Sequence, residues 1–413
     1  MSEKIALRRS ESAVSLLYSL SSRFFTFAVA FYLFSRFTFS RIHFNWGSPY
    51  TFASLEQYLA SASSAPYCYR VLPAYLMKAI DTMFGRAVAA SLNSIPELQI
   101  FAAHFRVTSE HAWLIVPLFT LFFLCFYLFC LVFRFMLSHF CARRAIVCGG
   151  LLFLSAALPI FFQQGTHFIY DPFTLLLSAG MLLAVLKGSW GWYYATFFLA
   201  CINKELALVA AVPFFAVRHE QDGSYVLRRH LLIHAGIFGA VRLLIYFFFN
   251  FCNGGGALLP ALPGLLTDNL IRAFGSPLLT DFAYFTAALG VVYLVCRKLA
   301  DKPASLRYVP SMMVLLGLLL MWGGIWGEIR VFYEALPAAL ILVYWNFIEL
   351  LNIKFDDSTR DPAGTLFRLS CSIVTIIVGA ALIYGACIHA AYSLDYAIVT
   401  EGTLLSGSAM HNG

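Results

Sequence analysis

Polar residues recur as short clusters beside long apolar stretches, and their types suit acid–base chemistry and phosphate binding. Three clusters stand out: Tyr170-Asp171-Pro172, Asn203-Lys204-Glu205 and Glu328-Ile329-Arg330. A carboxylate can accept a proton from a hydroxyl group, and Lys or Arg can bind a phosphate, Arg with bidentate geometry. Charged side chains are costly in hydrocarbon, so those beside membrane helices usually face a protein interior or an aqueous cavity and mark a functional site.

The elements that must position these clusters are membrane helices. Hydrophobic residues make up 61% of the 413 residues and charged residues only 12%, and the mean hydropathy is +0.78. A chain of this composition cannot fold with a surface that faces water, so we expect a polytopic integral membrane protein. The predicted fold class is all-α, with about 10 to 11 membrane segments in a single transmembrane domain.

Apolar runs of about 17 to 25 residues mark the predicted spans. They lie near 15–38, 112–136, 145–163, 172–186, 231–250, 279–296, 309–326, 333–351 and 370–392. With the N-terminus in the cytoplasm, Lys and Arg fall in every second loop, as the positive-inside rule requires. This holds only if 190–217 enters and leaves on one side, as a hairpin of short helices with Asn203-Lys204-Glu205 at its tip.

Two longer segments are expected outside the membrane. Residues 39–111 are predicted to form a folded extracytoplasmic loop, in which 52–59 and 71–80 have the apolar spacing of surface-lying amphipathic helices. Residues 251–278 form the second outer loop. The predicted topology brings the polar residues of these and other outer segments to one face, where they indicate an outward-facing cavity: Glu56, Tyr67, Tyr69, Arg70, His167, Tyr170, Asp171, Asn203, Lys204, Glu205, Glu328, Arg330 and Glu334.

Other classes of site have little support. The net charge of +7 is accounted for by the cytoplasmic loops, so no nucleic-acid partner is expected. The ten cysteines lack zinc-type spacing, and the phosphate-loop, dinucleotide and hydrolase signatures are absent. We therefore predict no metal site. Dependence on a divalent cation stays open, because no clear DxD motif occurs.

A resemblance rests on this layout and on three short motifs, residues 66–73 (PYCYRVLP), 203–205 (NKE) and 327–330 (GEIR). A long outer loop with surface helices and an acid, a later span opening on another acid, and short helices mid-chain resemble the GT-C superfamily of integral-membrane glycosyltransferases. The resemblance implies a polyprenyl-phosphate-linked sugar donor, an acceptor that is a glycan, a lipid or a protein, and transfer of a hexose or pentose at the extracytoplasmic face.

The resemblance also implies roles. Glu56 is the candidate general base, although it lies later in the first outer loop than the superfamily's carboxylate usually does, and Asp171 would orient the acceptor or a metal. The implied phosphate ligands are Arg70, Lys204 and Arg330, and Tyr170, Glu205 and Glu328 complete the predicted binding group.

Each residue also has a structural alternative. Glu56 could be a solvated residue of a surface helix, Asp171 a helix cap, and Arg70 a cation that reaches lipid headgroups. Glu328 and Arg330 could form an ion pair at the membrane interface. Lys204 and Glu205 are adjacent and point in different directions on a helix, which argues against a salt bridge between them.

Two other functions fit the same residues. A transporter or flippase of a lipid-linked sugar or small anion also uses intramembrane charges, and a polysaccharide polymerase or ligase shares the donor chemistry. The gathering of polar clusters on one face favours a transferase, since a transporter must expose its site to both faces. Short loops and the lack of a terminal retention signal favour a bacterial inner membrane.

Overall fold

The computed structural model describes residues 22–38, 71–104, 107–141, 143–163, 169–253, 289–323 and 329–351. Within these ranges the regular secondary structure is helical, and no strand occurs. The all-α fold class expected from the sequence is therefore confirmed for the part of the chain that the structure describes.

The helices follow the apolar runs closely. After a helix at 22–38 come α4 (Leu72–Leu92), α5 (Pro96–His104), the 3-10 helix η2 (Ala112–Leu114), α6 (Ile115–Phe140), α7 (Arg144–Gln163) and α8 (Asp171–Leu186). The second half holds α9 (Trp190–Asn203), α10 (Ala207–Ala210), α11 (Val212–Asn253), a helix at 289–296, η3 (Leu299–Asp301), α14 (Ala304–Arg307), α15 (Val309–Gly323), η4 (Ile329–Glu334) and α16 (Leu336–Leu350).

Two helical stretches among the described residues, Ala112–Phe140 and Val226–Phe247, are long and apolar enough to cross a membrane. Shorter apolar helices occur at Arg144–Pro159, Asp171–Leu186, Ala304–Leu319 and Leu336–Leu350. This composition and length support membrane association. The predicted span 370–392 and the second outer loop beyond Asn253 lie outside the described residues.

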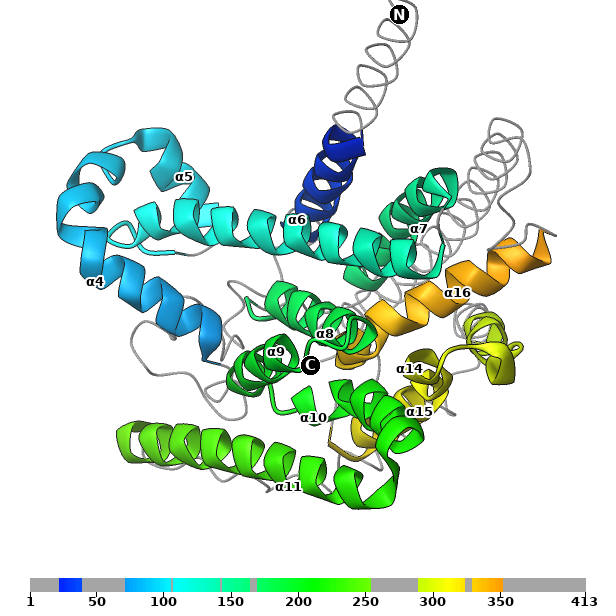
Figure 1. Ribbon diagram of the computed structural model, residues 1–413. Coiled ribbons are helices and arrows are strands. Elements are labelled where there is room, and N and C mark those ends of the chain that lie inside the picture. The colour runs from blue at the N-terminus through cyan, green and yellow to red at the C-terminus, as the bar shows by residue number, and fades with distance from the viewer. Residues whose placement is uncertain are drawn as a thin grey trace, which may run out of the picture.

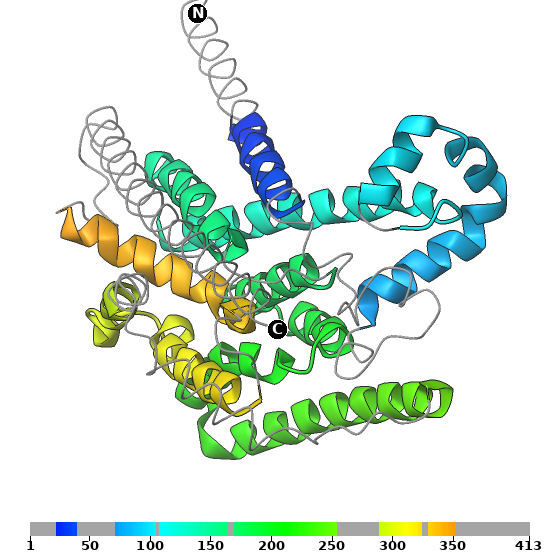
Figure 2. The same ribbon diagram turned by 180° about the vertical axis from the view of Figure 1, so that it is seen from behind.

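Helix α8 occupies the middle of the bundle, between α6 and α9 (Figures 1 and 2). Its buried residues cover all sides of the helix, from Asp171 and Phe173 to Val185. A helix that is apolar all round is one that other helices surround, which explains why 172–186 has no polar stripe. The start of α8 is thereby held in a fixed position inside the protein.

Residues 190–217 fold back on themselves. Helix α9 runs up to Asn203, the chain turns at residues 204–206, and α10 and the first turns of α11 run back beside α9. Tyr193 stacks on Phe214, with ring centroids 4.3 Å apart and an interplanar angle of 13°. Asn203 and Lys204 therefore lie at the turn between two antiparallel helices.

Helix α11 bends sharply after its first turns. The rings of Phe214 and His230 are 5.1 Å apart, whereas a straight helix would separate these positions by about 24 Å. The bend makes the second part of α11 a separate long helix (Figure 1). It lies beside the first turns of α9, where Tyr193 and Tyr194 form hydrogen bonds with His234 and His230. The polar segment between Arg218 and Arg229 forms the bend.

The segment between the first helix and α6 contains α4 and α5. Asn93 connects them to the following turn, because its side chain donates to Glu110 O at 2.7 Å and accepts from Trp113 N at 2.9 Å. Helix α4 continues to Leu92, well beyond the predicted segment 71–80, and it exposes large apolar residues, Met83 and Phe84 among them. The predicted helix at 52–59 is outside the described residues.

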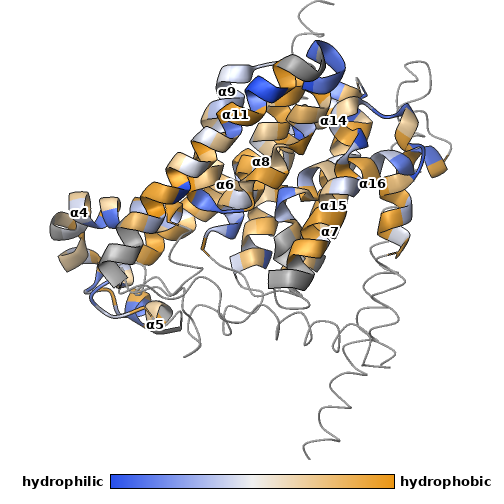
Figure 3. Cartoon of the chain, turned by 90° about the horizontal axis from the view of Figure 1, so that it is seen from below, coloured by the Kyte–Doolittle hydropathy of each residue, from blue (hydrophilic) through white to orange (hydrophobic). Residues whose placement is uncertain are grey.

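The bundle has two chemically different ends. Hydrophilic residues gather at the bend of α11, close to α14, and again around α5, whereas the helices between are mainly hydrophobic (Figure 3). At the first end Arg307 pairs with Glu220 at 2.8 Å and Lys302 with Glu349 at 2.9 Å. Glu334 lies just before α16 and Glu349 lies in its last turn. The 15 residues of α16 span about 22 Å, so the polar groups near Glu334 belong to the opposite end.

Candidate functional site

Parts of two predicted polar clusters meet Glu334 at one place. Tyr170 and Asp171 lie at the start of α8, Asn203 and Lys204 at the end of α9, and Glu334 ends η4 just before α16. All five side chains are buried, with at most 3% of each residue exposed. We call these five residues the polar junction. It joins three segments of the chain. The first and second segments are more than thirty residues apart in sequence, and the second and third are more than a hundred residues apart.

Hydrogen bonds from Asn203 connect α9 to α8. Its side-chain amide donates to Thr174 Oγ1 at 2.9 Å and to Tyr170 O at 3.2 Å. Thr174 Oγ1 in turn donates to Tyr170 O at 3.1 Å. Because buried donors are costly to leave unpaired, these bonds fix the turn after α9 against the first turn of α8.

Lys204 forms a buried ion pair with Glu334. The Nζ atom lies 2.9 Å from Oε1, and the two side chains are 4% and 1% exposed. Such a pair carries a large desolvation cost that only close, well-formed contacts offset. The ammonium group of Lys204 thus pairs with the carboxylate of a residue far along the chain.

A small cavity lies beside this ion pair. Its walls combine the ends of α8 and α9 with η4: Thr174, Leu177, Ser178, Ala200, Asn203, Lys204, Ala207 and Glu334. The free volume is about 10 Å³, which is room for a single water molecule. Asn203 Oδ1 and Glu334 Oε2 are buried and accept no hydrogen bond from any residue that the structure describes. A water in this cavity would satisfy such acceptors.

Asp171 is the first residue of α8 and is followed by Pro172. The helix cap is Tyr170, which makes no side-chain capping hydrogen bond. Asp171 is instead an acid in the first turn, where its charge is favourable to the helix dipole. Its burial next to the α9 turn places a carboxylate at the polar junction.

The other predicted site residues are distributed as follows. Glu205 follows Lys204 and is half-buried, and it acts electrostatically on Glu334. Arg330 belongs to η4, four residues before Glu334. Glu56, Arg70 and Glu328 lie outside the described residues, so the structure does not bring them to the polar junction or separate them from it.

Sequence reasoning gave no role to three residues of the site. Glu334 stood among the outer polar residues without a partner, because nothing local connects it to Lys204. Thr174 and Ser178 were read as part of an apolar span. Their spacing is the signal that could have identified them, because residues four apart lie on one face of a helix, the face that begins at Tyr170.

No three His, Cys, Asp or Glu side chains lie close enough to hold a metal ion in the part of the chain that the structure describes. Comparisons with protein-family models, with curated proteins and with solved structures found no match. The chemistry of the polar junction is therefore the basis for a functional assignment.

Proposed function

We propose that the protein is a polytopic membrane glycosyltransferase with a GT-C-like layout, which transfers a sugar from a polyprenyl-phosphate donor at the extracytoplasmic face. The observation that carries the proposal is the polar junction. It brings a carboxylate and an ammonium group from distant segments together at the end of the bundle opposite the Arg- and Lys-rich loops. By the positive-inside rule, that opposite end is extracytoplasmic.

The reaction would be a single displacement at the anomeric carbon. The acceptor oxygen forms a bond to this carbon while the bond to the phosphate oxygen breaks, and the acceptor proton passes to a carboxylate, Asp171 or Glu56. Polyprenyl phosphate leaves with the electron pair. Lys204, Arg330 and Arg70 would hold its negative charge, and one displacement inverts the anomeric centre.

The substrate would bind next to the polar junction and not within it. The cavity beside Lys204 has room for one water, so a sugar occupies space above the ends of α8 and η4. Glu334 keeps the Lys204 ammonium in a fixed position beneath that space. A preorganised cation costs little reorganisation when charge develops on the leaving phosphate.

A test compares purified protein in lipid nanodiscs with two aspartate variants. Given a panel of polyprenyl-phosphate sugars and an acceptor extract, the wild type should release polyprenyl phosphate. Asp171→Asn should lower the rate by about 100-fold or more, the scale of a lost acid–base group. Asp222→Asn, which changes an aspartate on the exposed bend of α11, should leave it unchanged. Equal rates for all three proteins would contradict the assignment of Asp171.

A second candidate function has one observation in its favour. A buried Lys–Glu pair beside a water-sized cavity is also the arrangement of a proton or ion pathway in a transporter. Movement of the lipid-linked sugar between leaflets of sealed vesicles, without release of polyprenyl phosphate, would select this alternative.

A further inference from the structure

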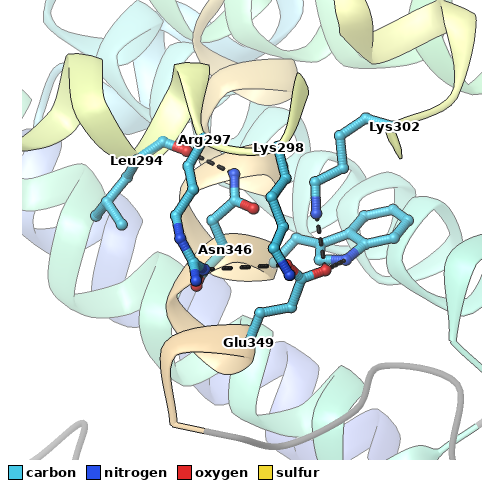
Figure 4. Close-up of polar contacts among 7 residues, drawn as sticks. Leu294, Arg297, Lys298, Lys302, Asn346 and Glu349 are labelled. Atoms are coloured by element: carbon cyan, nitrogen blue, oxygen red, sulfur yellow. Dashed lines mark hydrogen bonds and ion pairs between the residues drawn. The ribbon is translucent and has the colours of Figure 1, made fainter. Parts of the chain in front are cut away.

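The end of the bundle opposite the polar junction carries a cluster of basic residues. The chain between helix 289–296 and α14 contains Arg297, Lys298 and Lys302, and their side chains extend toward Glu349 in the last turn of α16 (Figure 4). We call these four residues the basic clamp. The three basic residues differ in how many of their hydrogen-bond donors contact other residues of the protein.

Lys302 is fully engaged. Its ammonium group lies 2.9 Å from Glu349 Oε1 and 4.4 Å from the centre of the Trp345 ring, and its side chain is 1% exposed. The same Glu349 oxygen accepts a hydrogen bond from Trp345 Nε1 at 2.7 Å. These contacts attach the loop to α16, so Lys302 has a structural role.

Arg297 and Lys298 are far less engaged. They lie 3.9 Å and 3.8 Å from Glu349 Oε2, which is beyond hydrogen-bonding distance. Arg297 donates one hydrogen bond, to Asn346 O at 3.3 Å, and Lys298 donates none to another residue that the structure describes. A guanidinium group has five N–H donors and an ammonium group has three. The described residues therefore leave most of the donor capacity of this pair unused.

Charge and backbone geometry also favour an added anion. Among the described residues, the acids near Arg297, Lys298 and Lys302 are Glu349 and Asp301, which leaves a surplus of one positive charge in this part of the structure. Lys298 has a φ angle of 48°, a left-handed conformation that strains a residue other than glycine. Such strain persists where the surrounding structure requires it, and it is frequent at binding sites.

Exposed apolar side chains lie on helix 289–296, which directly precedes this pair of cations in the chain. Helix 289–296 exposes Leu289, Val292 and Tyr293, with 52%, 48% and 60% of each accessible. Arg297 and Lys298 follow at its end. A row of exposed apolar residues that ends in two cations, whose donors the described residues leave largely unused, matches the chemistry of a phospholipid, in which acyl chains adjoin a phosphate.

We propose that Arg297 and Lys298 bind the phosphate of an anionic phospholipid, whose acyl chains lie along helix 289–296. The phosphate oxygens would accept hydrogen bonds from the Arg297 guanidinium and the Lys298 ammonium groups. The contact between Lys302 and Glu349 would hold the loop in place. This inference depends on the membrane location of the helices and is independent of the transferase reaction.

The test titrates purified full-length protein in mixed micelles with phosphatidylglycerol or phosphatidylcholine and records the bound lipids by native mass spectrometry. The wild type should retain phosphatidylglycerol in preference to phosphatidylcholine. Arg297→Ala and Lys298→Gly should each weaken phosphatidylglycerol binding by about ten-fold, the scale of a lost charge-assisted hydrogen bond. Lys187→Ala, which removes an exposed lysine after α8, is the control and should bind as the wild type does.

Lys298→Gly separates binding from folding. Glycine adopts the left-handed conformation without strain, so this variant should unfold at the same temperature as the wild type or a higher one while it loses lipid selectivity. Undiminished selectivity in Lys298→Gly would overturn the proposal. An equal loss in Lys187→Ala would also overturn it, as would full displacement of the lipid by millimolar inorganic phosphate, which would point to a free anion in place of a lipid.

Discussion

The buried ion pair of the polar junction should be worth far more to stability than an exposed one. Lys204→Met leaves the Glu334 carboxylate, whose side chain is 1% exposed, without its cation, and Glu334→Leu leaves the ammonium group without its anion. Removing one partner of a buried pair costs about 3–5 kcal/mol. Replacing both partners by apolar residues of similar size removes both desolvation costs, so the double variant should lie within about 1 kcal/mol of the wild type.

A double-mutant cycle measures this coupling directly. The free energy of unfolding of all four proteins is determined in mixed micelles. The losses of the two single variants, added together, should exceed the loss of the double variant by about 3 kcal/mol or more. Glu220→Leu is the matched control, because the Glu220–Arg307 pair is 44% and 38% exposed and should cost less than about 1 kcal/mol. Additive losses, or a Lys204→Met variant as stable as the wild type, would show that the two charges are not coupled in the folded protein.

Three further predictions concern other parts of the structure. Gly150→Ala should destabilise the protein by about 1–3 kcal/mol in thermal unfolding, because the added Cβ would overlap Leu137 Cδ1 and lie 3.0 Å from Tyr344 Cε1. In the same assay the control Gly191→Ala, whose added Cβ would meet open space, should be neutral or stabilising. Tyr193→Phe should cost about 1–3 kcal/mol because it removes the 2.8 Å bond to buried His234 Nε2, and Tyr194→Phe, whose bond to His230 is only partly buried, should cost less by the same measurement. In a cysteine-depleted background, an impermeant maleimide should label Ser94→Cys from outside and Lys187→Cys only from inside sealed vesicles, and labelling of both from one side would contradict the topology.

Hydropathy was sufficient to predict where three of the central helices lie. The apolar runs at 112–136, 145–163 and 172–186 correspond to α6, α7 and α8, since length and composition alone determine such helices. Helix α4 was predicted too short because the segment after residue 80 lacks a strong apolar period. Propensity extends that helix to Leu92 once its residues pack against α6.

Several residues of the polar junction could be predicted from the sequence, but the contacts between them could not. Charged side chains beside apolar runs are few, so Asp171 and Lys204 could be picked out from the sequence. The pairing of Lys204 with Glu334 depends on how α9 and η4 pack around α8, and no local pattern encodes such a contact. The left-handed backbone conformation of Lys298 could not be predicted either, because no sequence pattern marks a lysine in this conformation.

We propose that the polar junction belongs to a site for sugar transfer from a lipid phosphate. The most direct measurement is release of polyprenyl phosphate from radiolabelled polyprenyl-phosphate sugars by the wild type and by the Lys204→Met/Glu334→Leu variant in nanodiscs. We expect turnover by the wild type and at least about a 100-fold lower rate in a double variant that is equally stable. Turnover by the double variant at the wild-type rate, or none by the wild type with any donor, would contradict it.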